Sequence, residues 1–184
     1  MRLRFNEAKA TQAAAWFLKL RGTTMSYLKL IKLLYLLDRE ALLRWGRPIT
    51  TDSYVSMDNG PVVSRIYDLI LEEPDPGTDS AWRNHIGEPQ SYEVTLLQDP
   101  GSSELSRAEE NLIDEIFGQF GRMSRWELRD YSHTLPEWSD PNGSTIPISI
   151  RDILRAGKKT EAEIAGIEAE IENLAFAEAL ISPG

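Results

Sequence analysis

The sequence predicts a helix-rich α+β domain with a small antiparallel sheet and an acidic C-terminal helix. Three observations support this fold class: long segments repeat apolar residues with the period of a helix, three helix starts carry capping boxes, and two short segments have the pattern of strands. The 184 residues include no cysteine, which excludes disulfides and thiolate metal sites. We expect one domain over residues 1–157, with residues 158–184 forming the acidic helix, packed on that domain or on a partner.

The first third of the chain predicts two helices that each end at a glycine. Residues 7–21 have an apolar face, Asn6 as N-cap and Gly22 as stop signal. Residues 25–45 are apolar on nearly every face, so this helix belongs in the centre of a core. The pair resembles a helix-turn-helix only superficially, because a recognition helix must expose polar side chains to bases. We therefore expect no specific binding of nucleic acid.

A strand and a turn follow these helices. Residues 53–57 read as a strand, and the turn Asp58-Asn59-Gly60 comes directly after it. Proline is favoured in the first position of a helix, so we expect a helix to begin at Pro61. Gly60 should then have a positive φ, and Asp58 or Asn59 should cap that helix.

The second half predicts a long loop, two more strands and four helices. Residues 73–91 are rich in proline and glycine, and we expect Trp82 and Ile86 to attach this loop to the body. Residues 92–97 alternate as a strand, which we expect to join 53–57 and a strand near Ile146 in one sheet. One short helix is predicted over residues 149–155, and the other three open with capping boxes: Ser106 with Glu109, Ser124 with Glu127, and Thr160 with Glu163.

Charge is distributed unevenly along the chain. Residues 1–50 carry ten Lys and Arg against three Asp and Glu, whereas residues 51–184 carry ten against twenty-six. The net charge of −9 argues against non-specific binding to DNA. No stretch approaches the length of a membrane-spanning apolar segment, and the first residues lack the apolar run of a signal peptide. We expect a cytoplasmic protein without membrane contact.

The sequence offers no group of residues suited to catalysis. Its two histidines, His85 and His133, stand in unrelated contexts, so no metal site is predicted. Asp130, Ser132 and His133 lie too close together in sequence to converge as a triad, and His133 is better explained as a helix-terminal residue packed with Trp138. Phosphate-binding glycine loops are also absent, and the helix expected at Pro61 is weak evidence for an anion site. We expect neither a cofactor nor enzymatic activity.

Several motifs resemble one protein family in their order and spacing. They are YLKLIKLLYLLD (27–38) with GRPI (46–49), DNGPV (58–62) reached through Tyr54, and LRDYSHTLPEW (128–138). Together they resemble the Panacea domain of SocA-like antitoxins, a family that also includes phage-associated proteins. The resemblance spans residues 10–155.

The resemblance implies a non-enzymatic protein that neutralises a toxin encoded beside it by binding that toxin directly. A runner-up is an adaptor or regulator that binds a protein partner without a toxin, with delivery of that partner to a protease as one option. The family's marked positions fall on Lys32, Leu33, Tyr35, Gly60, Pro61, Val62, His133 and Trp138. We add Tyr54, Asp58 and Asn59 as candidates for partner contact. Whether these residues bind a toxin or hold the fold is left open, as is a homodimer.

The last predicted helix lies outside the resemblance. Residues 160–184 contain six glutamates and no lysine or arginine, and Ile164, Ile167, Ile171 and Leu174 form a narrow apolar stripe. Because like charges repel, packing must supply most of the stability of this helix. We expect the stripe to pack on the basic residues 1–50 or on a second copy of the chain. The alternative is a groove in a basic toxin.

Overall fold

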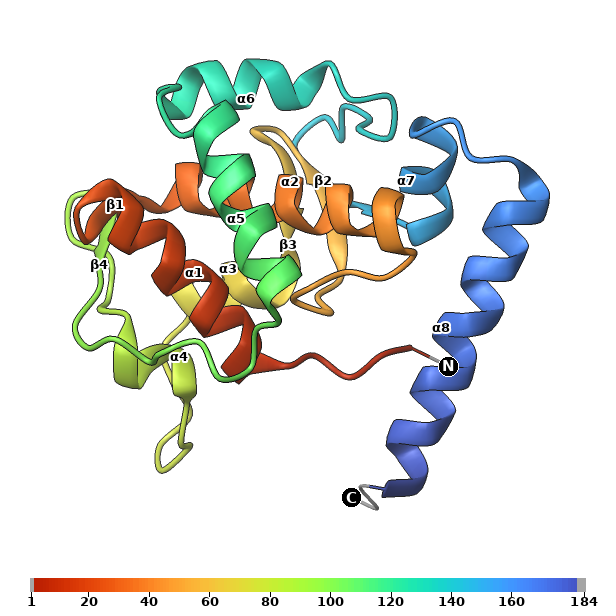
Figure 1. Cartoon of the computed structure of the whole chain (residues 1–184). Coiled ribbons are helices and arrows are strands. Elements are labelled where there is room, and N and C mark those ends of the chain that lie inside the picture. The colour runs from red at the N-terminus through yellow and green to blue at the C-terminus, as the bar shows by residue number, and fades with distance from the viewer. Residues whose placement is uncertain (1, 182–184) are drawn as a thin grey trace.

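The structure is a computed structural model that describes residues 2–181, and these residues form eight helices and two small antiparallel sheets (Figure 1). The predicted α+β class is confirmed. No helix in the described range is long and apolar enough to cross a membrane. The helices are α1 (Glu7–Arg21), α2 (Tyr27–Trp45), α3 (Ser64–Leu71), α4 (Ala81–His85), α5 (Arg107–Phe120), α6 (Arg125–His133), α7 (Ile150–Ala156) and α8 (Glu161–Ile181). The strands are β1 (Thr24–Ser26), β2 (Tyr54–Met57), β3 (Gly60–Val63), β4 (Glu93–Thr95) and β5 (Ile146–Ile148).

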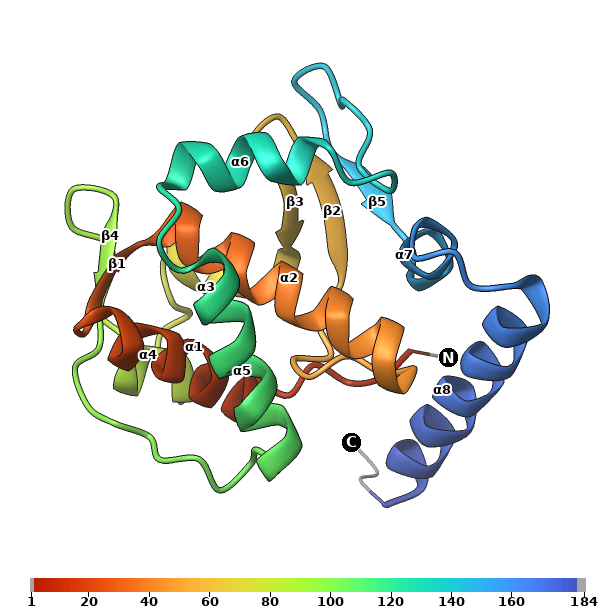
Figure 2. The same ribbon diagram turned by 45° about the horizontal axis from the view of Figure 1, so that its top comes forward.

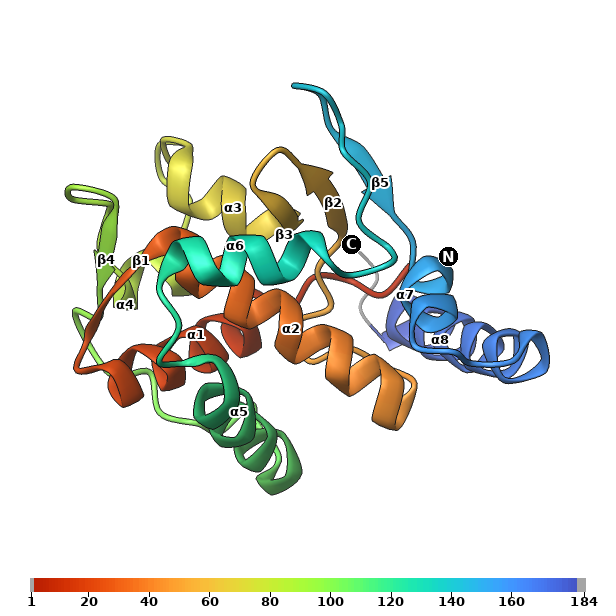
Figure 3. The same cartoon turned by 90° about the horizontal axis from the view of Figure 1, so that it is seen from above.

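Helix α2 forms the centre of the core, as its apolar sequence predicts. It contacts α1, α5, α6, α7 and β3, and Figure 3 shows it running through the middle of the molecule with α6 lying across it. Its predicted end at Gly46 is confirmed, since Gly46 has a φ of 73°. Its predicted start at Met25 is wrong by two residues, because residues 24–26 extend to pair with β4.

The central position of Leu33 leads to a first testable prediction. Its side chain is fully buried in α2. We expect Leu33→Ala to lower the free energy of unfolding by about 2–5 kcal/mol, through lost burial and the cavity left behind. Chemical denaturation measures this change. Leu20→Ala in α1 is the control, because Leu20 is 43% exposed. If both variants unfold at the same denaturant concentration, α2 is not the centre of the core.

The strands pair differently from the prediction. Strand β2 lies between β3 and β5, so the expected strand near Ile146 is confirmed (Figure 2). The strand predicted at 92–97 is shorter and belongs to the other sheet, where Val94 pairs with Met25 of β1. Its expected pairing with 53–57 is therefore wrong. The alternation of apolar and polar residues identified the strand correctly. Its pairing partner, however, depends on where α1 and α2 place β1, which lies between them in the chain.

The helix expected at Pro61 is also wrong, although Gly60 has the expected positive φ of 98°. Pro61 continues the hairpin as part of β3, and α3 begins three residues later at Ser64. Neither turn residue caps α3. The cap comes instead from Asp52, whose carboxylate oxygens accept hydrogen bonds from Arg65 N (2.8 Å) and Ile66 N (3.0 Å).

The loop expected over residues 73–91 is interrupted by α4, whereas the other local predictions hold. Trp82 and Ile86 are buried and attach the long loop to the body through the short helix α4 and a bridge to Leu96. The capping boxes at Ser106, Ser124 and Thr160 form as predicted. A fourth box, Ser149 with Asp152, opens α7.

Helix α8 lies at the edge of the molecule, beside α7 and the end of α2 (Figure 2). Ile164 and Ile171 are buried, and the Ile167 side chain reaches Gly46. The expected packing on residues 1–50 is only partly correct, because the cations that pair with the α8 glutamates come mostly from α7 and the turn after it. These pairs are Arg151 with Glu161 and Glu168, Arg155 with Glu161, and Lys159 with Glu163.

Candidate functional site

The motifs that carry the family resemblance converge in space. The middle of α2, the β2–β3 hairpin and the end of α6 pack on one another, and in Figure 2 α6 passes in front of the turn end of the hairpin. We call this group the motif cluster: Lys32, Tyr35, Tyr54, Asp58, Asn59, Gly60, Pro61, Val62, His133 and Trp138. Its members fall into three groups of contacts.

The first group joins α2 to the outer edge of β3. Lys32 is fully buried, and its Nζ donates a hydrogen bond of 2.6 Å to the carbonyl oxygen of Pro61. Since β3 is an edge strand, that carbonyl has no strand partner, and Lys32 supplies the missing donor. Burial lowers the pKa of Lys32 to about 7. The neighbouring Val62 is buried in the core.

Gly60 allows this close approach. A Cβ atom at this position would lie 2.3 Å from Ser132 Oγ and 3.0 Å from Lys32 Nζ. Its backbone φ of 98° is also a conformation that residues other than glycine rarely adopt. Gly60 is thus required both by its backbone conformation and by the packing of α2 and α6 around it.

The second group is a buried polar network that joins α2 to β2 and to Glu137, which follows α6 in the chain. The Tyr35 hydroxyl donates to Glu137 Oε1 (2.8 Å), and Arg39 Nε donates to the same oxygen (2.6 Å). The Tyr54 hydroxyl donates to Asp38 Oδ2 (2.9 Å), and the two tyrosine rings meet edge to face with centroids 5.7 Å apart. Burial is the largest cause that raises the pKa of each tyrosine, and its carboxylate partner adds to the shift. Both phenols therefore stay protonated donors.

Asp38 organises the connection between α2 and β2. Besides Tyr54, it accepts hydrogen bonds from Ile49 N, Thr50 N and the Thr50 hydroxyl. Burial raises the pKa of Asp38, while these donors oppose the rise by stabilising the carboxylate. The four hydrogen bonds compensate a fully buried carboxyl group that would otherwise be costly.

The third group reaches the surface at the tip of the hairpin. The His133 ring stacks on Trp138 with centroids 4.1 Å apart, and its Nε2 donates to the Asp58 carbonyl oxygen at 3.0 Å. Trp138 Nε1 donates to the Met57 carbonyl oxygen (3.1 Å), which holds the other side of the turn. This arrangement confirms the interpretation of His133 as a helix-terminal residue packed with Trp138. Asn59 is exposed at the tip.

The chemistry of the motif cluster is that of internal hydrogen bonds. Lys32 bonds to a backbone carbonyl, and Tyr35 and Tyr54 bond to the carboxylates of Glu137 and Asp38. Within residues 2–181 the only buried side-chain polar atom without a partner is Ser26 Oγ. The same residues contain no group of three or more His, Cys, Asp or Glu placed to hold a metal ion.

Sequence reasoning identified Tyr35 and Tyr54 but missed Glu137 and Asp38, their acceptors. Asp38 lies within the motif segment 27–38, and Glu137 lies within 128–138, directly before Trp138. Those positions were the signal available for finding them.

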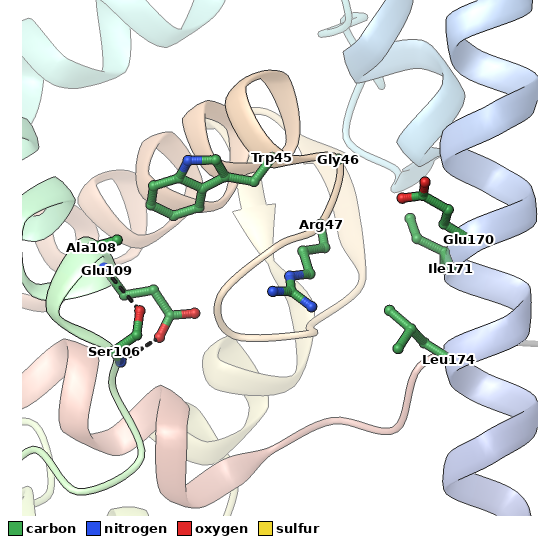
Figure 4. Close-up of a pocket in the computed structure, with 9 residues that line it drawn as sticks. All are labelled: Trp45, Gly46, Arg47, Ser106, Ala108, Glu109, Glu170, Ile171 and Leu174. Carbon is green, nitrogen blue, oxygen red and sulfur yellow. Dashed lines mark hydrogen bonds between the residues drawn. The ribbon is translucent and has the colours of Figure 1, made fainter.

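Two hollows are found at the surface, and one of them borders the buried network at Glu137. One, of about 480 Å³, opens beside Ser56 and Glu137 next to β5 and α7. The other, of about 540 Å³, separates α8 from the ends of α2 and α5, and Figure 4 shows Trp45 and Arg47 projecting toward it from one side and Leu174 from the other. Both are wide and shallow, and neither is lined by a histidine or by any residue of the motif cluster.

Comparison with known proteins gives one match. A family model described as "Antitoxin SocA-like, Panacea domain" matches residues 30–139, which is more than half of the chain and includes the whole motif cluster. Helix α8 lies beyond the matched range. No curated protein matches the chain, and no solved structure does.

Proposed function

We propose that this chain, which belongs to the antitoxin SocA-like, Panacea domain family, neutralises a protein toxin by binding it directly. The observation that carries the proposal is the family match over residues 30–139. Inhibition by binding requires a stable surface and no reacting group, and the motif cluster provides such a framework. The toxin in this proposal is a protein encoded beside the gene for this chain.

The arrangement of polar groups supports a role without catalysis. A nucleophilic mechanism needs a base within hydrogen-bond reach of a nucleophile and a third group that orients the base. His133 instead stacks on Trp138 and bonds to a backbone carbonyl, and the Ser132 hydroxyl donates to Arg129 O. We infer that the protein acts by stoichiometric contact.

Co-expression tests this function. We expect the protein to restore growth of cells that make the polypeptide encoded by the adjoining reading frame, and the two proteins to purify together in a fixed ratio. Rescue should survive His133→Ala, because binding energy is spread over a surface whereas catalysis fails with one essential residue. Thermal unfolding confirms that the variant is folded.

Three outcomes would count against the proposal. Absence of rescue by the wild-type protein contradicts an antitoxin role. Rescue at strongly substoichiometric levels that a folded His133→Ala variant loses would point to an enzyme. Rescue accompanied by falling levels of the toxin, followed by immunoblotting, would instead indicate an adaptor that delivers its partner to a protease.

A further inference from the structure

An exposed group of aromatic and arginine side chains lies away from the motif cluster, where α6 begins beside the hairpin that leads into β4. We call Tyr92, Arg125, Trp126 and Arg129 the arginine–aromatic patch. Tyr92 is 67% exposed and Trp126 is 47% exposed. The Arg125 guanidinium carbon lies 4.8 Å from the Trp126 ring centroid and 6.0 Å from that of Tyr92, and Arg129 lies 4.9 Å from Trp126. Stacking therefore holds these long side chains in place before any partner binds.

The backbone that presents Tyr92 is strained. Gln90 and Glu93 exchange two hydrogen bonds (2.8 and 3.0 Å), so Ser91 and Tyr92 are the central residues of a two-residue hairpin turn. Both have positive φ, 50° and 67°. A turn of this type favours Asn-Gly, and neither residue present here suits it. The turn also contacts the start of α2, where Tyr27 N donates to Tyr92 O (3.0 Å) and the two tyrosine rings lie with centroids 6.3 Å apart. The Tyr92 ring nevertheless stays 67% exposed, so an unfavourable turn displays an aromatic ring at the surface.

Positive charge surrounds the patch, although the protein as a whole is acidic. Arg21, Arg122 and Arg125 form no ion pair with any residue in the range 2–181. Lys29 Nζ donates a hydrogen bond to Gly121 O, in the turn between α5 and α6. Burial and then the nearby Arg21 lower the pKa of Lys29, while Glu127 opposes them.

The carboxylates near the patch are largely engaged within the chain. Glu127 bonds to Ser124 in a capping box, and Asp130 pairs with Arg129. The third nearby acid, Glu93, is exposed on β4. Cations therefore outnumber the acids that could neutralise them.

We propose that the arginine–aromatic patch is the surface that binds the toxin, and that the toxin presents carboxylates to it around an apolar contact. This inference rests on the proposed function. Tryptophan, tyrosine and arginine are the residues enriched among those that dominate binding energy at protein interfaces. The guanidinium groups of Arg125 and of the arginines without an ion pair can each bind a carboxylate through two parallel hydrogen bonds. Trp126 and Tyr92 supply rigid apolar surface.

The test compares patch variants with matched controls on the opposite side of the molecule. The probe is the polypeptide encoded by the adjoining reading frame, purified in an inactive form, and isothermal titration calorimetry gives the dissociation constant. We expect Trp126→Ala and Arg125→Glu each to weaken binding by about thirty-fold or more. Trp45→Ala and Arg107→Glu are the controls, since Trp45 is 40% exposed at the α8 hollow and Arg107 is highly exposed on α5. Both should bind within about two-fold of wild type.

A turn variant separates binding from folding. Ser91→Asn combined with Tyr92→Gly installs the residues that the turn prefers, which offsets the lost ring contact between Tyr92 and Tyr27. Thermal stability should therefore stay close to that of wild type while binding weakens. A merely structural role for Tyr92 would give the opposite result, a less stable protein with unchanged affinity. Wild-type affinity should also fall as salt is added, and Arg125→Glu should remove part of that dependence.

The outcomes separate this inference from the proposed function. If wild type neutralises the toxin and the folded patch variants bind it as tightly as the controls, the patch is not the interface, although the antitoxin role stands. If wild type neither binds nor neutralises that polypeptide, both proposals fail. Two further results would overturn the assignment: binding of single-stranded nucleic acid that Trp126→Ala abolishes, or concentration-dependent self-association that the same variant abolishes.

Discussion

Replacing Gly60 with alanine is expected to destabilise the protein by on the order of 3–5 kcal/mol. Part of the cost is conformational, because a φ of 98° is strained for any residue with a Cβ. The rest is steric, because that Cβ would overlap Ser132 Oγ and press on Lys32 Nζ. Neither neighbour can withdraw freely, since each is held by a hydrogen bond to a backbone carbonyl.

Gly22→Ala is the matched control for this variant. Gly22 has nearly the same φ, 103°, and nothing within 4 Å of the added Cβ, so it incurs the conformational cost alone. The difference between the two variants in urea denaturation therefore isolates the packing of the hairpin between α2 and α6. Equal destabilisation would show that Gly60 is needed only for its backbone conformation.

The second large effect concerns the pH dependence of stability set by Lys32. Its pKa is about 7 in the folded protein, against the ordinary lysine value of 10.5 that applies to the unfolded chain. Between these values the unfolded chain binds more protons, so the stability of wild type should rise with pH across this window. The full interval corresponds to on the order of 5 kcal/mol, of which about 3 kcal/mol falls between pH 7 and 9.5. Well below pH 7 Lys32 is charged in both states, and the folded state then bears the whole free-energy cost of burying that charge.

Lys32→Met should remove this contribution, because methionine keeps most of the volume and carries no charge. We expect the stability of the variant relative to wild type to be greatest near pH 7 and to decline toward pH 9.5. Urea midpoints at half-unit pH steps measure the trend, and Lys159→Met, at a partly exposed ion pair, provides the flat reference. Parallel profiles for wild type and Lys32→Met would mean that Lys32 titrates normally in the folded state.

Signals within a few residues of each other predicted the helices well. Asn6 accepts a hydrogen bond from Lys9 N, and Gly22 ends α1 in the left-handed region, as their positions in the sequence indicate. The capping boxes at Ser106 and Ser124 also form as expected. These features depend on contacts between residues at most four positions apart, which a sequence displays directly.

Errors arose where a distant residue decides the local structure. The fixed φ of proline suits both the start of a helix and an edge strand. Pro61 lies in the strand that pairs with β2, and Lys32, 29 residues earlier, donates to its outward carbonyl. Strand 92–97 was identified, but its pairing with β1 depends on the placement of Met25 after α1.

The motif cluster was predicted in part. Lys32 and Tyr35 were identified as marked positions of the family that the motifs resemble, and Tyr54 as the residue that leads into DNGPV. Glu137, the partner of Tyr35, is 102 residues away in sequence, and no local pattern links the two. The arginine–aromatic patch was missed for the same reason, since Tyr92 and Trp126 come from elements that meet only in the fold.

The order of the three-stranded sheet has a consequence for synthesis of the chain on the ribosome. Pro61 in β3 and Pro147 in β5 lie on the two outer strands, where proline discourages another strand from adding to the sheet. Strand β5 begins at Ile146, however, 89 positions after β2 ends at Met57. Until that segment emerges, one edge of β2 stays open in the nascent polypeptide. Chains that stop before Ile146 keep this edge unpaired, and we expect them to recruit strands from other unfinished chains and to aggregate.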